Sequence, residues 1–250
     1  MLEIKNVSKS YADKRVLHHI DLRLSHGIYA LLGPNGAGKS TLMNILCNQL
    51  NYEEGSVLYN DKDIRELKQA YYALLGYAPQ QQGLYDEFSG ERFLTYMALL
   101  KNIDRKQIRK EVLRVAELVN MQQHLKQRCG AYSGGMKQRI LVAQALLGSP
   151  EILLFDEPTA GLDPKERVSL RRVFDSLKEE HTLLIATHVV SDVESIADEV
   201  IFLKQGKLIA QGGVDELLLC HPVSLHWRSC ICICLPGKHH VEKSVCNGAV

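Results

Sequence analysis

The sequence predicts an α/β fold built around a mainly parallel sheet, and three observations support that prediction. Short apolar runs of the kind found in buried parallel strands occur at residues 28–32, 152–155 and 182–187. A stretch with the apolar period of a helix, residues 164–180, separates the last two of these runs. Strands that alternate with helices favour a parallel sheet with helices on both of its faces.

The N-terminal part of the chain is predicted to be mainly β. Strand-like runs occur at residues 2–7 and 17–24, before the buried run at 28–32. Two more strands are predicted at 56–59 and 74–78, with a charged turn at 60–65 between them. A polar loop follows at residues 79–83.

The middle of the chain changes to helix, from about residue 90 to residue 145. Apolar side chains there recur with the spacing of one helix face, at Ile108, Val112, Val115, Ala116 and Val119. We therefore predict an inserted helical subdomain at about residues 84–148. After strand and helix alternate again, a hairpin is predicted from strands at 200–203 and 208–211.

A phosphate-binding loop follows the run at 28–32. Residues 33–41 fit the pattern G-x-x-x-x-G-K-[ST], with Gly33, Gly38, Lys39 and Ser40 at its fixed positions. Backbone N–H groups of such a loop bind phosphates together with the N-terminus of the helix that follows. Lys39 is expected to neutralise the β- and γ-phosphates, and the Ser40 hydroxyl to ligate Mg²⁺. The chain is therefore predicted to bind a nucleoside triphosphate.

Two adjacent acids at the end of a second buried strand form a candidate hydrolytic centre. The run at 152–155 leads into Asp156 and Glu157, which places both carboxylates at the sheet edge where ligands bind. Asp156 is expected to hold Mg²⁺, and Glu157 to orient and deprotonate an attacking water. The alternative is that both acids merely begin the loop at Pro158, and it has less support beside a phosphate loop.

A second anion-binding corner is predicted at residues 133–135, where Ser133 and two glycines begin an apolar helix. On its own this pattern is only a capped helix start. One chain has no obvious use for two separate γ-phosphate sites. Two chains facing head to tail do, because each lends this corner to the nucleotide of the other.

Length and composition narrow the class of protein. The 250 residues suffice for one large domain or a domain with a subdomain, and the formal net charge of +1 gives no reason to expect a nucleic-acid partner. Nothing approaches about 18 consecutive apolar residues, and the N-terminus has the pattern of a strand rather than of a signal peptide. We therefore expect a cytoplasmic protein with reduced cysteines.

Together these motifs resemble the ATP-binding subunit of an ATP-binding-cassette (ABC) transporter, over about residues 2–219. They occur in the family's order, as the Walker A loop at 33–41, glutamine-loop residue Gln80, signature at 133–136, Walker B at 152–156 with Glu157, D-loop at 161–163 and switch histidine His188. Six ordered motifs are far more specific than any one of them. The resemblance implies a P-loop NTPase core with a mainly parallel sheet, an antiparallel β subdomain and an inserted helical subdomain.

The resemblance also implies a role for each matching residue. Glu157 matches the general base, His188 the residue that contacts the γ-phosphate, and Lys39 the phosphate lysine, which together form the catalytic set. The residues that match the Mg²⁺ shell are Ser40, Gln80 and Asp156, and Tyr11 matches the aromatic that stacks on adenine. The remaining ATP-binding positions are Gly33, Pro34, Asn35, Gly36, Ala37, Gly38, Thr41, Ser133, Gly134, Gly135 and Asp163. Residues 133–135 are implied to bind the γ-phosphate held by a partner subunit, and Asp163 to communicate across the dimer.

Partners and subtype follow from the same resemblance. Two such subunits, identical or related, are expected to close around two Mg·ATP and to move a separate membrane permease through a groove near residues 80–93. Met136 replaces the family's frequent Gln, and together with residues 85–96 and 159–164 it is similar to the ABC-2 branch of exporters. This implies a subunit that powers export from the cytoplasmic face of the membrane.

The main alternative is a soluble ABC-type ATPase that acts in repair or translation. Repair and chromosome types insert a long coiled coil, for which the stretch between Gln80 and Ser133 is too short, and translation types usually carry two cassettes. A GTPase would need Asn-Lys-x-Asp, which the sequence 60–63 does not match. A purely regulatory module is disfavoured by the complete set of Asp156, Glu157 and His188.

We expect the ATP-binding domain to span residues 1–220. Residues 221–250 form a tail with Cys230, Cys232 and Cys234 at alternate positions. Alternate strand residues face one side, which is a poor start for a tetrahedral metal site, so a closing strand with small apolar thiols is favoured.

Overall fold

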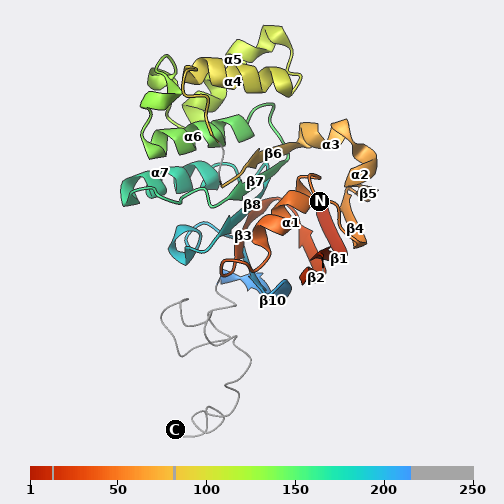
Figure 1. Ribbon diagram of the computed structural model, residues 1–250. Coiled ribbons are helices and arrows are strands. Elements are labelled where there is room, and N and C mark those ends of the chain that lie inside the picture. The colour runs from red at the N-terminus through yellow and green to blue at the C-terminus, as the bar shows by residue number, and fades with distance from the viewer. Residues whose placement is uncertain (13, 81–82, 215–250) are drawn as a thin grey trace, which may run out of the picture.

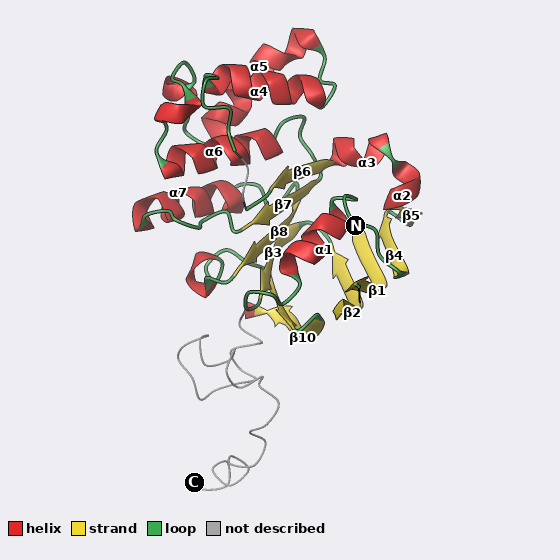
Figure 2. Cartoon of the chain, in the orientation of Figure 1, coloured by secondary structure: helices red, strands yellow, loops and turns green. Residues whose placement is uncertain are grey.

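The computed structural model describes residues 1–12, 14–80 and 83–214, so the cysteine-containing tail lies outside the described residues. Within them the longer strands form two sheets (Figures 1 and 2). The first is antiparallel, with the order β2-β1-β4-β5. Its strands are β1 (Leu2–Tyr11), β2 (Lys14–Leu24), β4 (Glu54–Tyr59) and β5 (Lys62–Asp63).

The second sheet has the order β10-β9-β3-β8-β7-β6. Its strands are β3 (Gly27–Leu32), β6 (Leu75–Ala78), β7 (Ile152–Asp156), β8 (Thr182–Thr187), β9 (Glu199–Lys204) and β10 (Lys207–Gly213). All neighbours pair in parallel except β9 and β10, which form the C-terminal hairpin. The predicted α/β fold, with a mainly parallel sheet beside an antiparallel β part, is confirmed.

Helices cover both faces of the parallel sheet. Their bounds are α1 (Lys39–Leu46), α2 (Ile64–Leu67), α3 (Gln69–Leu74), α4 (Gly90–Leu100), α5 (Arg105–Leu118), α6 (Gly134–Ala145) and α7 (Pro164–Asp175). Helices α4, α5 and α6 gather at the end of the molecule farthest from β10 (Figure 1). None of the helices in the described part of the chain has the length and apolar content needed to cross a bilayer.

The alternation of side chains on β3 separates two cores. Ile28, Ala30 and Leu32 pack in one apolar cluster with residues of α6 and α7. Tyr29 and Leu31 point to the other face and pack with α1 and the antiparallel sheet. A strand buried on both faces needs the continuous apolar run that the sequence shows at this position. Helices α6 and α1 therefore lie on opposite faces of the parallel sheet.

The predicted helix at residues 164–180 is too long. Helix α7 ends at Asp175, and residues 176–180 form turns. The hydroxyl of Ser176 donates to the carbonyl of Val173 at 2.7 Å, and the N–H of Leu177 donates to Phe174 at 3.0 Å. These bonds to the third preceding residue tighten the backbone and end the α-helical ladder.

The prediction of a simple charged turn after residue 59 is also incomplete. Residues 60–65 contain β5 and the start of α2, and α3 occupies the following stretch up to Leu74. Strand β6 accordingly begins one residue later than predicted. Tyr71 of α3 is fully buried, and its hydroxyl donates to the carbonyl of Leu46 at 2.6 Å. That tertiary contact stabilises a helix too short to show a clear period.

The topology places three loops at one edge of the parallel sheet. Strand β8 pairs in parallel with both β3 and β7, with Leu32 opposite Thr187 and Asp156 opposite Ala186. The segments that follow these strands therefore start side by side at their carboxyl ends. This is the edge at which open α/β sheets bind ligands.

Candidate active site

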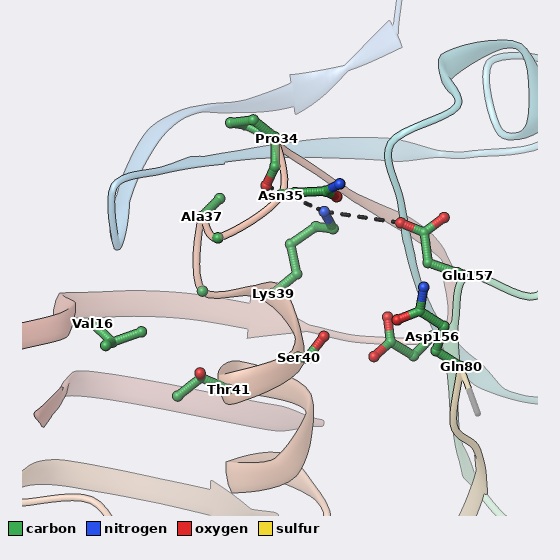
Figure 3. Close-up of a pocket in the computed structure, with 12 residues that line it drawn as sticks. Val16, Pro34, Asn35, Ala37, Lys39, Ser40, Thr41, Gln80, Asp156 and Glu157 are labelled. Carbon is green, nitrogen blue, oxygen red and sulfur yellow. Dashed lines mark hydrogen bonds and ion pairs between the residues drawn. The ribbon is translucent and has the colours of Figure 1, made fainter. Parts of the chain in front are cut away.

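A cavity of about 360 Å³ opens at this edge (Figure 3). Its lining residues are Val16, Pro34, Asn35, Gly36, Ala37, Gly38, Lys39, Ser40, Thr41, Gln80, Asp156 and Glu157. All of them except Val16 are site residues predicted from the sequence. Val16 lies on β2 against the phosphate loop (residues 33–41), where a Cβ on Gly38 would come within 3.1 Å of its carbonyl oxygen. Val16 belongs to no motif, so only the packing of the two sheets identifies it.

Glycines shape the phosphate loop. Gly36 and Gly38 have φ values of 78° and 107°, a region that glycine enters at low cost. Gly38 is also the N-cap of α1, and α1 has no side-chain cap. The first N–H groups of α1 therefore lack a capping acceptor, and the positive end of the helix dipole adds to their attraction for anions.

Lys39 is a buried cation at the mouth of the loop, only 7% exposed. Its Nζ donates to the carbonyl oxygen of Gly33 at 2.7 Å and lies 3.9 Å from Oε1 of Glu157. Burial lowers the pKa of Lys39, and the nearby carboxylates of Glu157 and Asp156 only partly offset that effect. An ammonium group removed from water in this way is stabilised by a bound anion.

Asp156 ends β7 with a carboxylate that the protein alone does not satisfy. The residue is 4% exposed, and its Oδ1 has no hydrogen-bond partner. Burial raises the pKa of Asp156, while a hydrogen bond from the Ser40 side chain acts in the opposite direction. A buried carboxylate beside a hydroxyl and the amide of Gln80 is the oxygen-rich set that Mg²⁺ prefers, so these residues fit that ion.

Glu157 is held by the neighbouring strand β8. Thr187 donates through Oγ1 to Oε2 of Glu157 at 3.2 Å, and Nδ1 of His188 lies 2.8 Å from Oε1. Because a carboxylate can only accept, Nδ1 of His188 is the donor in this contact. Glu157 itself has φ = 51°, a left-handed conformation that costs energy in a residue with a side chain. Such strain is characteristic of functional sites.

The predicted signature corner (residues 133–135) begins α6. Ser133 is its N-cap, and Oγ of Ser133 accepts from the N–H of Met136 at 3.2 Å. A Cβ on Gly135 would come within 1.9 Å of Oε1 of Glu166, so a larger residue there would have to displace that side chain. Asp163 caps α7 by accepting from the N–H of Glu166 at 2.8 Å. The two segments predicted to act across a dimer, the signature corner and Asp163, therefore each stand at the capped N-terminus of a helix.

The signature corner and Asp163 are not among the described residues that line the cavity. The structure brings together the phosphate loop, Gln80, the two acids and, through Glu157, His188. It leaves the signature corner on the helix that packs against the opposite face of the sheet from α1.

Tyr11 also lies outside the set of lining residues. It stands at the end of β1 with 48% of its surface exposed, and Nζ of Lys9 lies 5.5 Å from the centre of its ring. An exposed ring at a strand end is open to a planar stacking partner.

Comparison with known proteins gives consistent results. The family model described as ABC transporter matches residues 17–160. The chain is 33% identical over 219 residues to the uncharacterized ABC transporter ATP-binding protein YxlF of Bacillus subtilis (strain 168), covering 87% of this chain and 72% of that protein. It is 34% identical over 219 residues to the lantibiotic transport ATP-binding protein SrtF of Streptococcus pyogenes, covering 86% of this chain and 92% of that protein. The dimeric structure of MJ0796, a bacterial ABC transporter cassette, matches with a TM-score of 0.76 and 26% identity, covering 86% of this chain and 99% of that one.

Proposed function

This chain belongs to the ABC transporter family. From that membership we propose how its residues bind and hydrolyse ATP, and which transport process the hydrolysis powers. It is an ATP-binding subunit and an ATPase that powers transport through a separate permease. One observation supports the residue-level mechanism. The phosphate loop, the acid pair and His188 follow three adjacent parallel strands and meet at one edge of the sheet.

Binding starts at the phosphate loop. The uncapped N–H groups of α1 attract the phosphates, and Lys39 exchanges its contact with the Gly33 carbonyl for the β- and γ-phosphates. Tyr11 stacks on the adenine ring. The buried ammonium and the phosphate charge stabilise each other because neither is well solvated there.

Ser40, Gln80 and Asp156 would hold Mg²⁺. Support comes from the unpartnered Oδ1 of Asp156, which lies buried beside the Ser40 hydroxyl. When bound, the ion supplies charge neutralisation on the phosphates.

Hydrolysis depends on Glu157 as the general base. Its carboxylate orients the attacking water and accepts the proton, while Thr187 and His188 hold the carboxylate in place. With Nδ1 engaged by Glu157, the Nε2 atom of His188 is left to contact the γ-phosphate. Phosphoryl transfer of this kind is mostly positioning and charge neutralisation, so each lost group has a large effect on turnover.

The signature corner completes the site of a second subunit. In one chain, Ser133 and the glycines lie on the far side of the sheet from the phosphate loop, which favours a head-to-tail pair. Each subunit then contributes its corner to the nucleotide of the other, and Asp163 communicates across the interface. ATP acts as the link that closes the pair.

We assign the transport direction as export, on the basis of Met136 and the similarity to SrtF, whose name describes lantibiotic transport. The subunit sits at the cytoplasmic face of the membrane, where the permease docks near residues 80–93. Residues 1–220 form the ATP-binding domain, with a helical subdomain at about 84–148.

The substitution Glu157→Gln tests the assignment of the base. The amide keeps the size and the hydrogen-bond acceptor of Glu157 but cannot take a proton, so turnover should fall by about a hundred-fold or more while ATP binding persists. ATP hydrolysis and equilibrium binding are measured on the same preparation. Glu111→Gln is the matched control, because Glu111 pairs with Arg114 in the helical part of the chain and should keep full turnover. Parental hydrolysis by the Glu157→Gln variant would show that the base is another group.

A further inference from the structure

A buried carboxylate lies just beyond the active site, and none of the motifs includes it. Asp192 ends the short helix that follows His188, and it is only 4% exposed. Burying an ionised carboxylate is costly unless strong donors surround it. The identity of those donors therefore indicates what the residue does.

The first donor to Asp192 comes from the loop that carries the base. The hydroxyl of Thr159, itself 3% exposed, donates to Oδ2 of Asp192 at 2.5 Å. Thr159 stands two residues after Glu157, and Asp192 stands four residues after His188. The contact therefore joins the acidic loop (residues 157–163) to the histidine loop (residues 188–192).

The second donor comes from helix α7. Nη1 of Arg167 donates to Oδ1 and Oδ2 of Asp192 at 3.3 and 3.2 Å. Nε of the same guanidinium donates to the carbonyl of Leu162 at 3.0 Å, directly before Asp163. One arginine thus connects the histidine loop to the end of the acidic loop. Arg171 adds a further bond, from Nη1 to the carbonyl of Ser191 at 2.9 Å.

These contacts close a ring around the catalytic pair. At one side, Nδ1 of His188 contacts Glu157 at 2.8 Å, and at the other side Asp192 accepts from Thr159. The backbone of the two loops completes the ring. If only the first contact existed, each loop could swing about it, and the base and the histidine could lose their common orientation.

We propose that Asp192 is a positioning residue for hydrolysis, which locks the acidic loop and the histidine loop into one unit through Thr159 and Arg167. The lock holds Glu157 and His188 in their mutual orientation and ties Asp163 to the same unit. Asp192 is buried and is not among the described residues that line the cavity, so we expect it to act on turnover and to leave nucleotide binding at Lys39 nearly unchanged. This inference rests on the proposed roles of Glu157 and His188.

The test uses three single variants of the full chain. Thr159→Val removes the hydroxyl at nearly constant volume, Asp192→Asn removes the charge that pairs with Arg167, and Thr159→Ser keeps the hydroxyl but removes the methyl group. We expect the first two to lower kcat about ten-fold with KM for ATP nearly unchanged, and Thr159→Ser to stay near the parent. The double variant Thr159→Val/Asp192→Asn should be no slower than the slower single variant, because both changes disable the same lock between the two loops.

Two controls separate this role from a loss of folding and from failure of the parent mechanism. Glu111→Gln breaks a comparable cluster, in which Glu111 binds Arg114 and accepts from the N–H of Gly148, and it should leave kcat unchanged. Glu157→Gln is measured in the same assay. If Glu157→Gln stops turnover but Thr159→Val and Asp192→Asn keep the parental kcat, the positioning role is wrong while the base assignment stands. Additive effects in the double variant, or a Thr159→Ser variant as slow as Thr159→Val, also overturn it.

Discussion

At the scale of single residues, the site contains groups whose burial or backbone conformation lowers the stability of the folded protein. The ammonium of Lys39 and the carboxylate of Asp156 are both buried, and burial disfavours the charged form of each. Glu157 adds a left-handed backbone conformation. Such features persist where the surrounding structure enforces them, and a bound ligand repays their cost.

Asp156→Asn should therefore stabilise the ligand-free protein while it destroys activity. Because the pKa of Asp156 is raised in the folded state, ionising it costs stability as pH rises past the ordinary aspartate range, and that cost is present at pH 7. The neutral amide avoids it, so the free energy of unfolding should rise by about 1 kcal/mol, and ATP hydrolysis should fall about a hundred-fold.

Urea unfolding at pH 7 without Mg²⁺ or nucleotide measures this gain. Asp175→Asn, which changes an exposed carboxylate paired with Lys178, is the control and should shift stability by no more than about 0.5 kcal/mol. An Asp156→Asn variant less stable than the parent would mean that the carboxylate is already well satisfied without a cation.

At the scale of elements, the end of α6 opposite the signature corner is fixed by two cations. Nζ of Lys101 donates to the carbonyl of Leu147 at 2.8 Å, and Nη2 of Arg114 donates to that of Leu146 at 2.9 Å. Cations at a helix C-terminus satisfy its free carbonyls and complement its dipole. The helix that presents the signature corner is thereby held at its far end by α5 and by the end of α4.

Lys101 gives this cap a pH dependence. Burial lowers its pKa to about 8, below the 10.5 of an ordinary lysine. Between these values the unfolded chain binds more protons than the folded one, so the contribution of Lys101 to stability rises with pH. The free-energy difference between the parent and Lys101→Met should therefore grow from pH 8 to pH 10, by at most about 1.4 kcal/mol per pH unit.

Urea unfolding of both proteins at several pH values gives this difference, and groups common to both cancel. The exposed Lys110, changed to Met, serves as the control on α5. A difference for Lys101→Met that stays flat or shrinks between pH 8 and pH 10 would contradict the sign derived from burial.

The strands that lead into the site could be predicted from the sequence, because each is a continuous apolar run followed directly by a motif. These are the strands that end at Leu32, Asp156 and Thr187. Short elements could not be predicted. Helices α2 and α3 have too few residues to show a period and exist through contacts such as that of Tyr71 with Leu46.

The same distinction applies within the site. Val16 and Asp192 belong to no motif, because their proximity to the phosphate loop and to Thr159 arises only when distant segments pack. Sequence reasoning identifies residues by type and spacing along the chain. It does not find a valine or an aspartate whose importance depends on a neighbour about twenty or more residues away in the sequence. The individual roles given to the motif residues stay predictions until the variants are measured.

At the scale of the whole molecule, the two halves of the nucleotide site are separated. The phosphate loop and α1 lie on one face of the parallel sheet, and α6 with the signature corner packs on the other (Figure 1). One chain cannot fold its own corner over its own cavity without breaking the core between them. The central claim is therefore that a complete site needs two chains.

Mixing two defective chains tests this claim most directly. Lys39→Ala impairs the phosphate loop and Ser133→Arg blocks the corner, and each is combined with Glu157→Gln so that bound ATP is not hydrolysed. A dimer that contains one chain of each kind has one complete site, formed by the loop of the Ser133→Arg chain and the corner of the Lys39→Ala chain.

Retention of labelled ATP is measured by gel filtration for each chain alone and for the mixture. We predict that neither chain alone retains ATP in a dimer, whereas the mixture retains about one ATP per two chains. Failure of the mixture to retain ATP, or full retention by the Ser133→Arg chain alone, would contradict the two-chain site.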